Sequence, residues 1–295
     1  MKLPSPARAL RWLIILVVVA VVLLYIVLPV GIGVAATFPA KESVGPPPDG
    51  FEEIALKTDD GVTLAGWYTP PANGAAIVLL HGAGGSREAV RPYAALLARH
   101  GYGVLALDLR GHGQSGGWTN RFGWQGTADV GAAVKYLQAR AEVKQIGGLG
   151  LSMGGEALLG AASDYPALRA IVADGATRRD LAEMLALPME QPLYRNFTAR
   201  VTFAAVQILS GDRPPNKPLL DSMVEAQSTR FLLIAGGANA LEVAFNELFA
   251  AAVGARASLW VAPGASHIGA FGMYGEEYER RVIAFLDETL LGHSQ

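Results

Sequence analysis

Short, wholly apolar stretches alternate with helical stretches along most of this 295-residue chain, and this rhythm limits the possible folds most strongly. The apolar stretches have no regular alternation of polar residues, so both faces of each predicted strand must be covered. Such strands, when they alternate with helices, are typical of a parallel sheet with helices on both sides. The sequence therefore predicts an α/β fold. The predicted strands are 75–80, 104–107, 146–151, 170–173, 231–235 and 258–261.

Helical stretches separate these strands, and a β-hairpin precedes them. The runs 51–58 and 62–69 flank Asp59-Asp60-Gly61, a sequence typical of a hairpin turn. The segment 177–229 interrupts the rhythm with five prolines, and we expect it to form a small cap insertion over the active site. The alternative is an insertion that only packs on the surface. The predicted helices are 88–100, 128–140, 154–163, 241–253 and 278–291, within a domain expected to span 51–295.

A long uncharged apolar segment precedes this domain. No charged residue lies between Arg11 and Lys41, and a helix of about 20 apolar residues spans the hydrocarbon core of a membrane. We expect a transmembrane signal-anchor helix at 12–34, a cytoplasmic N-terminus at 1–11 and a Pro/Gly-rich linker at 35–50.

The basic residues Lys2, Arg8 and Arg11 precede this apolar segment. By the positive-inside rule they indicate a single-pass protein of the cell membrane, with the folded domain outside the cytoplasm. The alternative is a signal peptide that is cleaved near Ala36, which would release a secreted domain.

Charge and cysteine content exclude several classes of site. The 24 Lys and Arg residues balance 26 Asp and Glu residues, so no basic surface for nucleic acid is indicated. The chain has no cysteine, which excludes disulfides, thiolate metal ligands and a cysteine nucleophile. The five histidines form no His-Glu-x-x-His run, so we expect no catalytic metal and no cofactor.

Ser152 is the residue most clearly marked for chemistry. It lies in the run 150–155, Gly-Leu-Ser-Met-Gly-Gly, between a predicted strand and a predicted helix. A turn of this kind holds the serine in a strained conformation with its hydroxyl projecting, and glycines flank it because nothing larger fits. We expect Ser152 to be the nucleophile, with the backbone N–H of Met153 near the reacting centre.

Loops that follow other predicted strands supply the remaining groups. The run 81–86, His-Gly-Ala-Gly-Gly-Ser, can turn backbone N–H groups toward a developing oxyanion, and Ala83 is expected to share this task with Met153. His267 follows the last predicted strand, and its pKa suits a general base. The run 108–115, Asp-Leu-Arg-Gly-His-Gly-Gln-Ser, is expected to fix its loop through hydrogen bonds, and His81 is expected to be structural. His100 and His293 are not expected to compete with His267.

Taken together and in this order, these motifs resemble those of the α/β-hydrolase superfamily, and most of all its branch of monoacylglycerol lipases and related esterases. The resemblance covers about 51–291. It implies an eight-stranded, mostly parallel sheet and a catalytic triad in the order serine, acid, histidine. The implied activity is hydrolysis of a small-molecule ester, lipid-like esters included, through a serine acyl-enzyme. The alternatives are an exported serine peptidase or amidase and a catalytically silent binding protein on the same fold.

The acid of the triad departs from the family pattern. An aspartate usually follows the next-to-last strand in a Gly-x-x-Asp setting, but Asn239 holds that place in the run 236–242. Glu242 is the nearest carboxylate, and we expect it to orient His267. Asp174, after the preceding strand, is the alternative acid. A third possibility is an incomplete triad in which Asn239 orients the histidine without a charge.

Overall fold

The computed structural model describes residues 5–39, 41–118, 120, 122–187, 189 and 192–292; Lys2 and His293, which entered the sequence argument, lie outside them. The described part contains one eight-stranded sheet in the order β1-β2-β4-β3-β5-β6-β7-β8. The β1–β2 and β2–β4 pairs are antiparallel and all other pairs are parallel. The predicted α/β class and mostly parallel sheet are therefore confirmed. The strands are β1 (Glu52–Lys57), β2 (Thr63–Thr69), β3 (Ala75–Leu80), β4 (Gly103–Leu107), β5 (Gln145–Leu151), β6 (Leu168–Asp174), β7 (Arg230–Gly236) and β8 (Ala257–Ala262).

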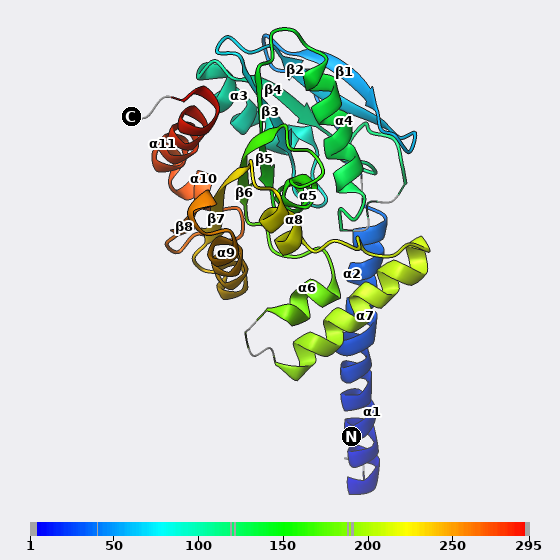
Figure 1. Cartoon of the computed structure of the whole chain (residues 1–295). Helices are drawn as coiled ribbons and strands as arrows, with labels where there is room; N and C mark the ends of the chain where they lie inside the picture. Colours follow the sequence, from blue (N-terminus) through cyan, green and yellow to red (C-terminus); the bar gives the residue numbers. More distant parts are fainter. Residues whose placement is uncertain are drawn as a thin grey trace.

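Helices cover both faces of the sheet (Figure 1). The side chains of β3 show why, because alternate residues point to opposite faces and all are fully buried. Val78 packs in the core formed with α4, α5 and α9, whereas Ile77 packs in the core formed with α3 and α11. The helices are α3 (Arg91–Arg99), α4 (Gly126–Gln138), α5 (Met153–Ala161), α9 (Ala240–Val253), the short α10 (Ala270–Met273) and α11 (Gly275–Leu286). Shorter turns are the 3₁₀ segments Arg87–Val90 and Gly254–Arg256 and a π-helical turn at Asp287–Leu291.

The segment 177–229 divides into two parts. Helices α6 (Leu181–Ala186) and α7 (Leu193–Ser210) lie away from the sheet, and α7 crosses the N-terminal helix (Figure 1). Helix α8 (Leu219–Glu225) instead packs into the body, where Leu219 and Met223 are buried. The Ser222 hydroxyl of α8 also donates a hydrogen bond to the Gly160 carbonyl, at 3.1 Å. Only the first part of the expected insertion therefore stands apart from the body of the domain.

The N-terminal apolar segment forms one helix from Pro6 to Thr37, made of α1 (Pro6–Val22), a π-helical turn (Leu23–Val27) and α2 (Leu28–Thr37). It is longer than the expected 12–34, and residues 35–37, expected in the linker, are helical. The helix continues because the stretch 35–37 contains neither proline nor glycine and the Thr37 hydroxyl bonds back to the Gly33 carbonyl, at 2.8 Å. Its length and composition suit a membrane span or a signal sequence.

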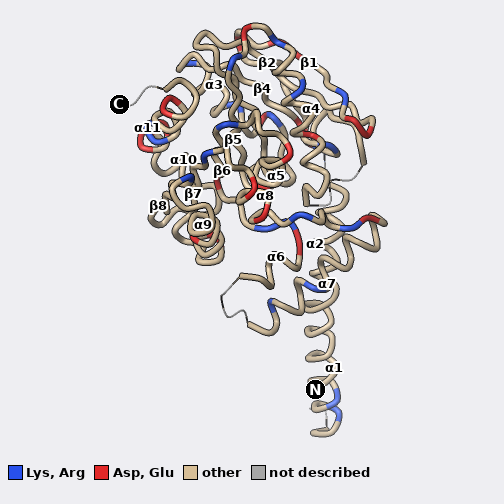
Figure 2. Tube along the Cα trace, viewed as in Figure 1, with Lys and Arg blue, Asp and Glu red and all other residues tan. Residues whose placement is uncertain are grey.

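Most of this helix extends beyond the folded domain, with its side chains exposed (Figure 1). Figure 2 shows an uncharged stretch between the basic residues near the start of the helix and the domain. An apolar helix of this length is not stable in contact with water on all sides, so the surface is compatible with a membrane anchor or with a signal sequence.

The second half of the helix packs against the cap. A Cβ atom on Gly33 would lie 2.8 Å from the Ala205 Cβ and 3.0 Å from the Thr202 carbonyl oxygen, so α7 crosses α2 where only glycine fits. The Thr202 hydroxyl donates to the Pro29 carbonyl at 3.2 Å. One turn of α7 away, the Phe197 ring meets the Tyr25 ring edge to face, with centroids 5.9 Å apart. The apolar helix is thus joined to the domain by tertiary contacts.

Candidate active site

Ser152 occupies a sharp turn between β5 and α5. Its backbone has φ 49° and ψ −116°, a conformation that side chains rarely adopt. The turn is tight because a Cβ atom on Gly150 would lie 2.4 Å from the Gly154 carbonyl carbon, and one on Gly154 would lie 2.6 Å from the Leu80 carbonyl oxygen. The Ser152 N–H donates to the Asp174 carbonyl at 2.7 Å, which ties the turn to β6. The sequence motif therefore forms the strained turn expected of it.

A line of hydrogen bonds joins Ser152, His267 and Glu242. The His267 Nε2 atom lies 2.9 Å from the Ser152 Oγ, and its Nδ1 atom lies 2.6 Å from the Glu242 Oε2. Glu242 is completely buried in the first turn of α9, and its other oxygen accepts the Gly236 N–H at 2.6 Å. The contact expected between this glutamate and the histidine is present.

Asn239 holds the place where the family pattern has an aspartate, and the carboxylate that contacts His267 comes from Glu242, three residues later. Its side-chain oxygen accepts the Glu242 N–H at 3.3 Å, so it caps the N-terminus of α9. A residue three positions later lies one helical turn further along, and the longer glutamate side chain makes up the difference in reach. Asn239 makes no hydrogen bond to His267 among the contacts of the described residues. The geometry does not support the incomplete triad in which the asparagine orients the histidine.

The surroundings raise the pKa values of both His267 and Asp174. The hydrogen bond to Glu242 raises the pKa of His267 against the opposing effect of burial. Burial and the charge of Glu242 raise the pKa of Asp174 to about 7, and its carboxylate makes no hydrogen bond of normal geometry among the described residues. His267 lies at hydrogen-bond distance from Glu242, whereas the Asp174 carboxylate has no such contact among the described residues. The geometry therefore favours Glu242 over Asp174 as the acid.

Ala83 and Met153 both line the cavity that contains Ser152 and His267. Met153 is the first residue of α5, so its N–H has no acceptor within the helix. Ala83 follows Gly82, where an added Cβ would lie 3.4 Å from the Ser152 Cβ. The structure thus brings both predicted oxyanion-binding residues to the site.

The loop that carries Ala83 is fixed by two histidines. The His81 Nε2 atom accepts the Leu109 N–H at 3.0 Å, and its Nδ1 atom lies 2.7 Å from the Gly82 carbonyl oxygen. Burial, helped by the nearby His112, lowers the pKa of His81 to about 3, so His81 stays neutral. The His112 Nε2 atom accepts the Gly84 N–H at 3.1 Å. The expected structural role of His81 is confirmed.

Charged residues of the run 108–115 fix the loops next to Ala83 through hydrogen bonds. The buried Asp108 carboxylate accepts the backbone N–H groups of Arg87 at 2.6 Å and Gln114 at 2.8 Å. The Arg110 Nε donates to the buried Asp129 carboxylate at 2.7 Å. These bonds satisfy buried charges inside the loops, so the prediction that this motif fixes its loop is confirmed.

The cavity next to Ser152 has a volume of about 760 Å³. Residues from widely separated parts of the chain line it. Its polar lining includes Glu156 of α5 and Thr177 and Arg178 at the start of the cap segment. One Glu156 oxygen accepts hydrogen bonds from the Thr177 N–H and hydroxyl, each at 3.0 Å, and from the Arg178 N–H at 3.1 Å. Glu156 was not among the residues predicted for the site, although it is a lone carboxylate in an otherwise apolar helix directly after the serine motif.

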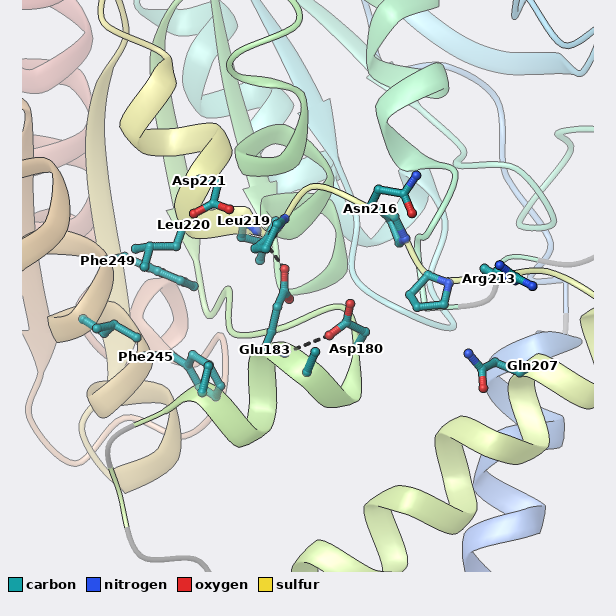
Figure 3. Close-up of a pocket in the computed structure, with 16 residues that line it drawn as sticks. Asp180, Glu183, Gln207, Arg213, Asn216, Leu219, Leu220, Asp221, Phe245 and Phe249 are labelled. Atoms are coloured by element: carbon teal, nitrogen blue, oxygen red, sulfur yellow. Dashed lines mark hydrogen bonds between the residues drawn. The ribbon is translucent and has the colours of Figure 1, made fainter.

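A second cavity of about 630 Å³ lies between α6, α8 and α9 (Figure 3). Phe245 and Phe249 form part of its apolar wall, and Glu183 bridges it by accepting the Leu219 N–H at 2.7 Å. Its lining does not include Ser152 or His267. Over the described ranges, no cluster of three or more histidine or acidic side chains is placed to hold a metal ion.

Comparison with known proteins identifies the family. A family profile described as alpha/beta hydrolase fold matches residues 75–230. This chain belongs to the α/β-hydrolase fold family. A crystal structure of the esterase Pf2001 of Pyrococcus furiosus superposes with a TM-score of 0.70 and 27% identity, over 86% of this chain and 98% of that one.

Two curated relatives match a smaller part of the chain. The uncharacterized protein YfhR of Salmonella typhi is 31% identical over 193 residues, which are 59% of this chain and 65% of that protein. The thiohydrolase aneE of Aspergillus aculeatus is 32% identical over 128 residues, or 41% of this chain and 40% of that protein. The chain therefore spans less than two thirds of the length of either relative.

Proposed function

We propose that this protein is a serine esterase with Ser152 as the nucleophile, His267 as the general base and Glu242 as the acid. The observation that carries the proposal is the line of two short hydrogen bonds from Glu242 through His267 to the Ser152 hydroxyl. Membership of a hydrolase family and the likeness to an esterase structure support it.

The proposed reaction follows from this geometry. His267 Nε2 takes the Ser152 proton as the serine oxygen attacks the ester carbonyl carbon, and the N–H groups of Ala83 and Met153 stabilise the oxyanion. The protonated histidine then gives its proton to the departing alcohol, which leaves an acyl-serine. Water, activated by the same histidine, releases the carboxylic acid. Glu242 stabilises the imidazolium that forms in each half of the reaction.

Active-site labelling of the full-length protein in detergent tests this proposal. A fluorophosphonate should inactivate hydrolysis of p-nitrophenyl butyrate, and mass spectrometry should find the adduct on the peptide that contains Ser152. A matched butyryl thioester should also be cleaved, since a thiohydrolase is among the relatives. An adduct on another serine, no adduct at all, or faster cleavage of a matched anilide than of the ester would contradict the proposal.

We further propose that the helix Pro6–Thr37 anchors the protein in the cell membrane with the catalytic domain outside the cytoplasm. Arg8 and Arg11 precede its uncharged stretch, and the exposed apolar side chains suit lipid contact. The protein should stay with membranes after extraction at alkaline pH, and protease added to intact spheroplasts should digest the domain. Recovery in the soluble fraction, with an N-terminus near Thr37, would show instead a cleaved signal peptide.

A further inference from the structure

The apolar N-terminal helix forms one wall of the catalytic cavity. Leu24, Leu28 and Ile32 line the same cavity as Ser152 and His267. Met184 and Phe203, from the two cap helices, continue this apolar surface. A water-soluble substrate would not need a binding surface that comes from a segment outside the hydrolase domain.

The depth of these residues follows from the geometry of the helix. If the membrane boundary lies at Arg11, a rise of about 1.5 Å per residue puts Leu24 about 20 Å and Ile32 about 32 Å further along the axis. The hydrocarbon core is about 30 Å thick, so Leu24 lies in the leaflet next to the catalytic domain and Ile32 lies at the boundary of that leaflet. The cavity wall therefore runs from the depth of lipid acyl chains to the membrane interface.

The cap helix α7 has the surface expected of an element at the membrane interface. Leu193 is 88% exposed and Ile208 is 81% exposed, a level that is unusual for large apolar side chains at both ends of one helix in water. Phe197 is also exposed in part and contacts Tyr25 of the anchor helix. Arg195 and Arg200 lie on the same helix, as basic residues do in helices that bind the membrane surface.

We propose that the substrate is an ester lipid of the surrounding bilayer, which enters the cavity sideways between the anchor helix and α7. Its acyl chain lies along Leu24, Leu28 and Ile32, with the ester carbonyl at Ser152. The polar part of the lipid meets the polar lining of the cavity, formed by Glu156, Thr177 and Arg178. The acyl chain then passes from the bilayer into the protein without contact with water. This path avoids most of the free-energy cost of exposing the acyl chain to water.

The chemistry rests on the proposed esterase function and adds no reactant to it. The acyl C–O bond of the lipid breaks, and water supplies a hydroxyl to the acyl carbon and a proton to the alcohol. The products are a fatty acid and a lipid with a free hydroxyl, both of which can return to the bilayer by the same path.

Two leucines of the anchor helix make a matched pair of variants. Leu23 and Leu28 are exposed to the same extent, 53% and 55%, but only Leu28 is among the residues that line the cavity. In L28W the indole should fill the acyl path. In L23W the indole should face lipid or solvent. Both proteins should be reconstituted at full length in vesicles of phosphatidylethanolamine and phosphatidylglycerol that contain monooleoylglycerol.

The assay compares total fatty acid released from the vesicles with hydrolysis of p-nitrophenyl acetate added in water. We expect L28W to release fatty acid at least tenfold more slowly than the wild type, and to lose a clearly smaller part of its activity on the acetate, whose acyl group has only two carbons. L23W should match the wild type on both substrates. Equal fluorophosphonate labelling of the three proteins shows that each has a folded active site.

The outcomes separate this inference from the function on which it rests. If the wild type cleaves the acetate but releases no fatty acid from vesicles, or if L28W and L23W behave alike, entry along the anchor helix is wrong and the esterase proposal stands. If the wild type neither cleaves the acetate nor reacts with the fluorophosphonate, the proposed function itself has failed.

Discussion

Ser152→Ala should lower kcat for p-nitrophenyl butyrate by a factor on the order of 10⁵ to 10⁶, the loss typical when a serine nucleophile is removed. The substitution deletes one oxygen atom, and with it both the attacking group and the hydrogen bond to His267 Nε2. Residual hydrolysis should come only from the oxyanion-binding groups and substrate binding. Labelling by the fluorophosphonate should disappear completely.

The loss should not come from unfolding. The backbone turn is held by the close packing of Gly150 and Gly154 and by the bond from the Ser152 N–H to the Asp174 carbonyl, none of which involves the serine hydroxyl. The circular dichroism spectrum and thermal midpoint should therefore match those of the wild type. Ser228→Ala, at a half-buried serine outside the cavity, is the control and should keep full activity. Turnover by Ser152→Ala close to that of the wild type would exclude the acyl-enzyme mechanism.

The central sheet was predictable because its signal is local. The inner parallel strands are buried on both faces and read as continuous apolar runs, as β3 does with six fully buried residues, whereas the edge strand β8 is only partly buried. The nucleophile turn was equally readable, since Gly150 and Gly154 are required by contacts within six residues of Ser152 or with the adjoining strand. The predicted contact between Glu242 and His267 is present, because glutamate can reach from one helical turn further than aspartate.

Other features have no local signal. The sequence shows that the segment 12–34 is apolar, but not that Leu28 and Ile32 face a cavity whose serine lies more than a hundred residues later in the chain. That contact depends on where α7 crosses α2, and the crossing is set by Gly33 and small side chains on the facing helix. A single glycine inside an apolar helix is too common to predict a partner. The division of the segment 177–229 between the cap and the body is non-local for the same reason.

Glu242→Gln should lower kcat by about 10³- to 10⁴-fold with little change in KM, as expected for a group that acts mainly in the transition state. The Glu242 carboxylate accepts hydrogen bonds from the Gly236 N–H, from His267 Nδ1 and, at 3.4 Å, from the Asn239 side-chain amide. An amide has only one oxygen, so if it keeps the bond to Gly236, its NH₂ group faces the histidine. His267 must then accept at Nδ1 and carry its proton on Nε2, the tautomer that cannot take the serine proton.

The pH dependence of kcat/KM gives an independent test of the contact between Glu242 and His267. Because Glu242 raises the pKa of His267, the wild-type kcat/KM should fall on the acid side below a midpoint that is higher than the ordinary histidine value of about 6.5. Below that midpoint the histidine is protonated and cannot act as the base. In Glu242→Gln the charged partner is gone while burial remains, so the midpoint of the remaining activity should move to lower pH.

Asp174→Asn is the matched control, since it neutralises the other buried carboxylate near His267 without touching the hydrogen-bonded line. It should change kcat by less than tenfold and shift the acid midpoint only slightly, because Asp174 contributes just a minor part of the raised pKa of His267. A large loss in Asp174→Asn together with a small loss in Glu242→Gln would move the acid to the end of β6. Small losses in both would mean that the histidine works without a carboxylate partner. We expect the larger loss of kcat in Glu242→Gln because, of these two carboxylates, only Glu242 is hydrogen-bonded to the His267 ring, which holds the serine proton during the reaction.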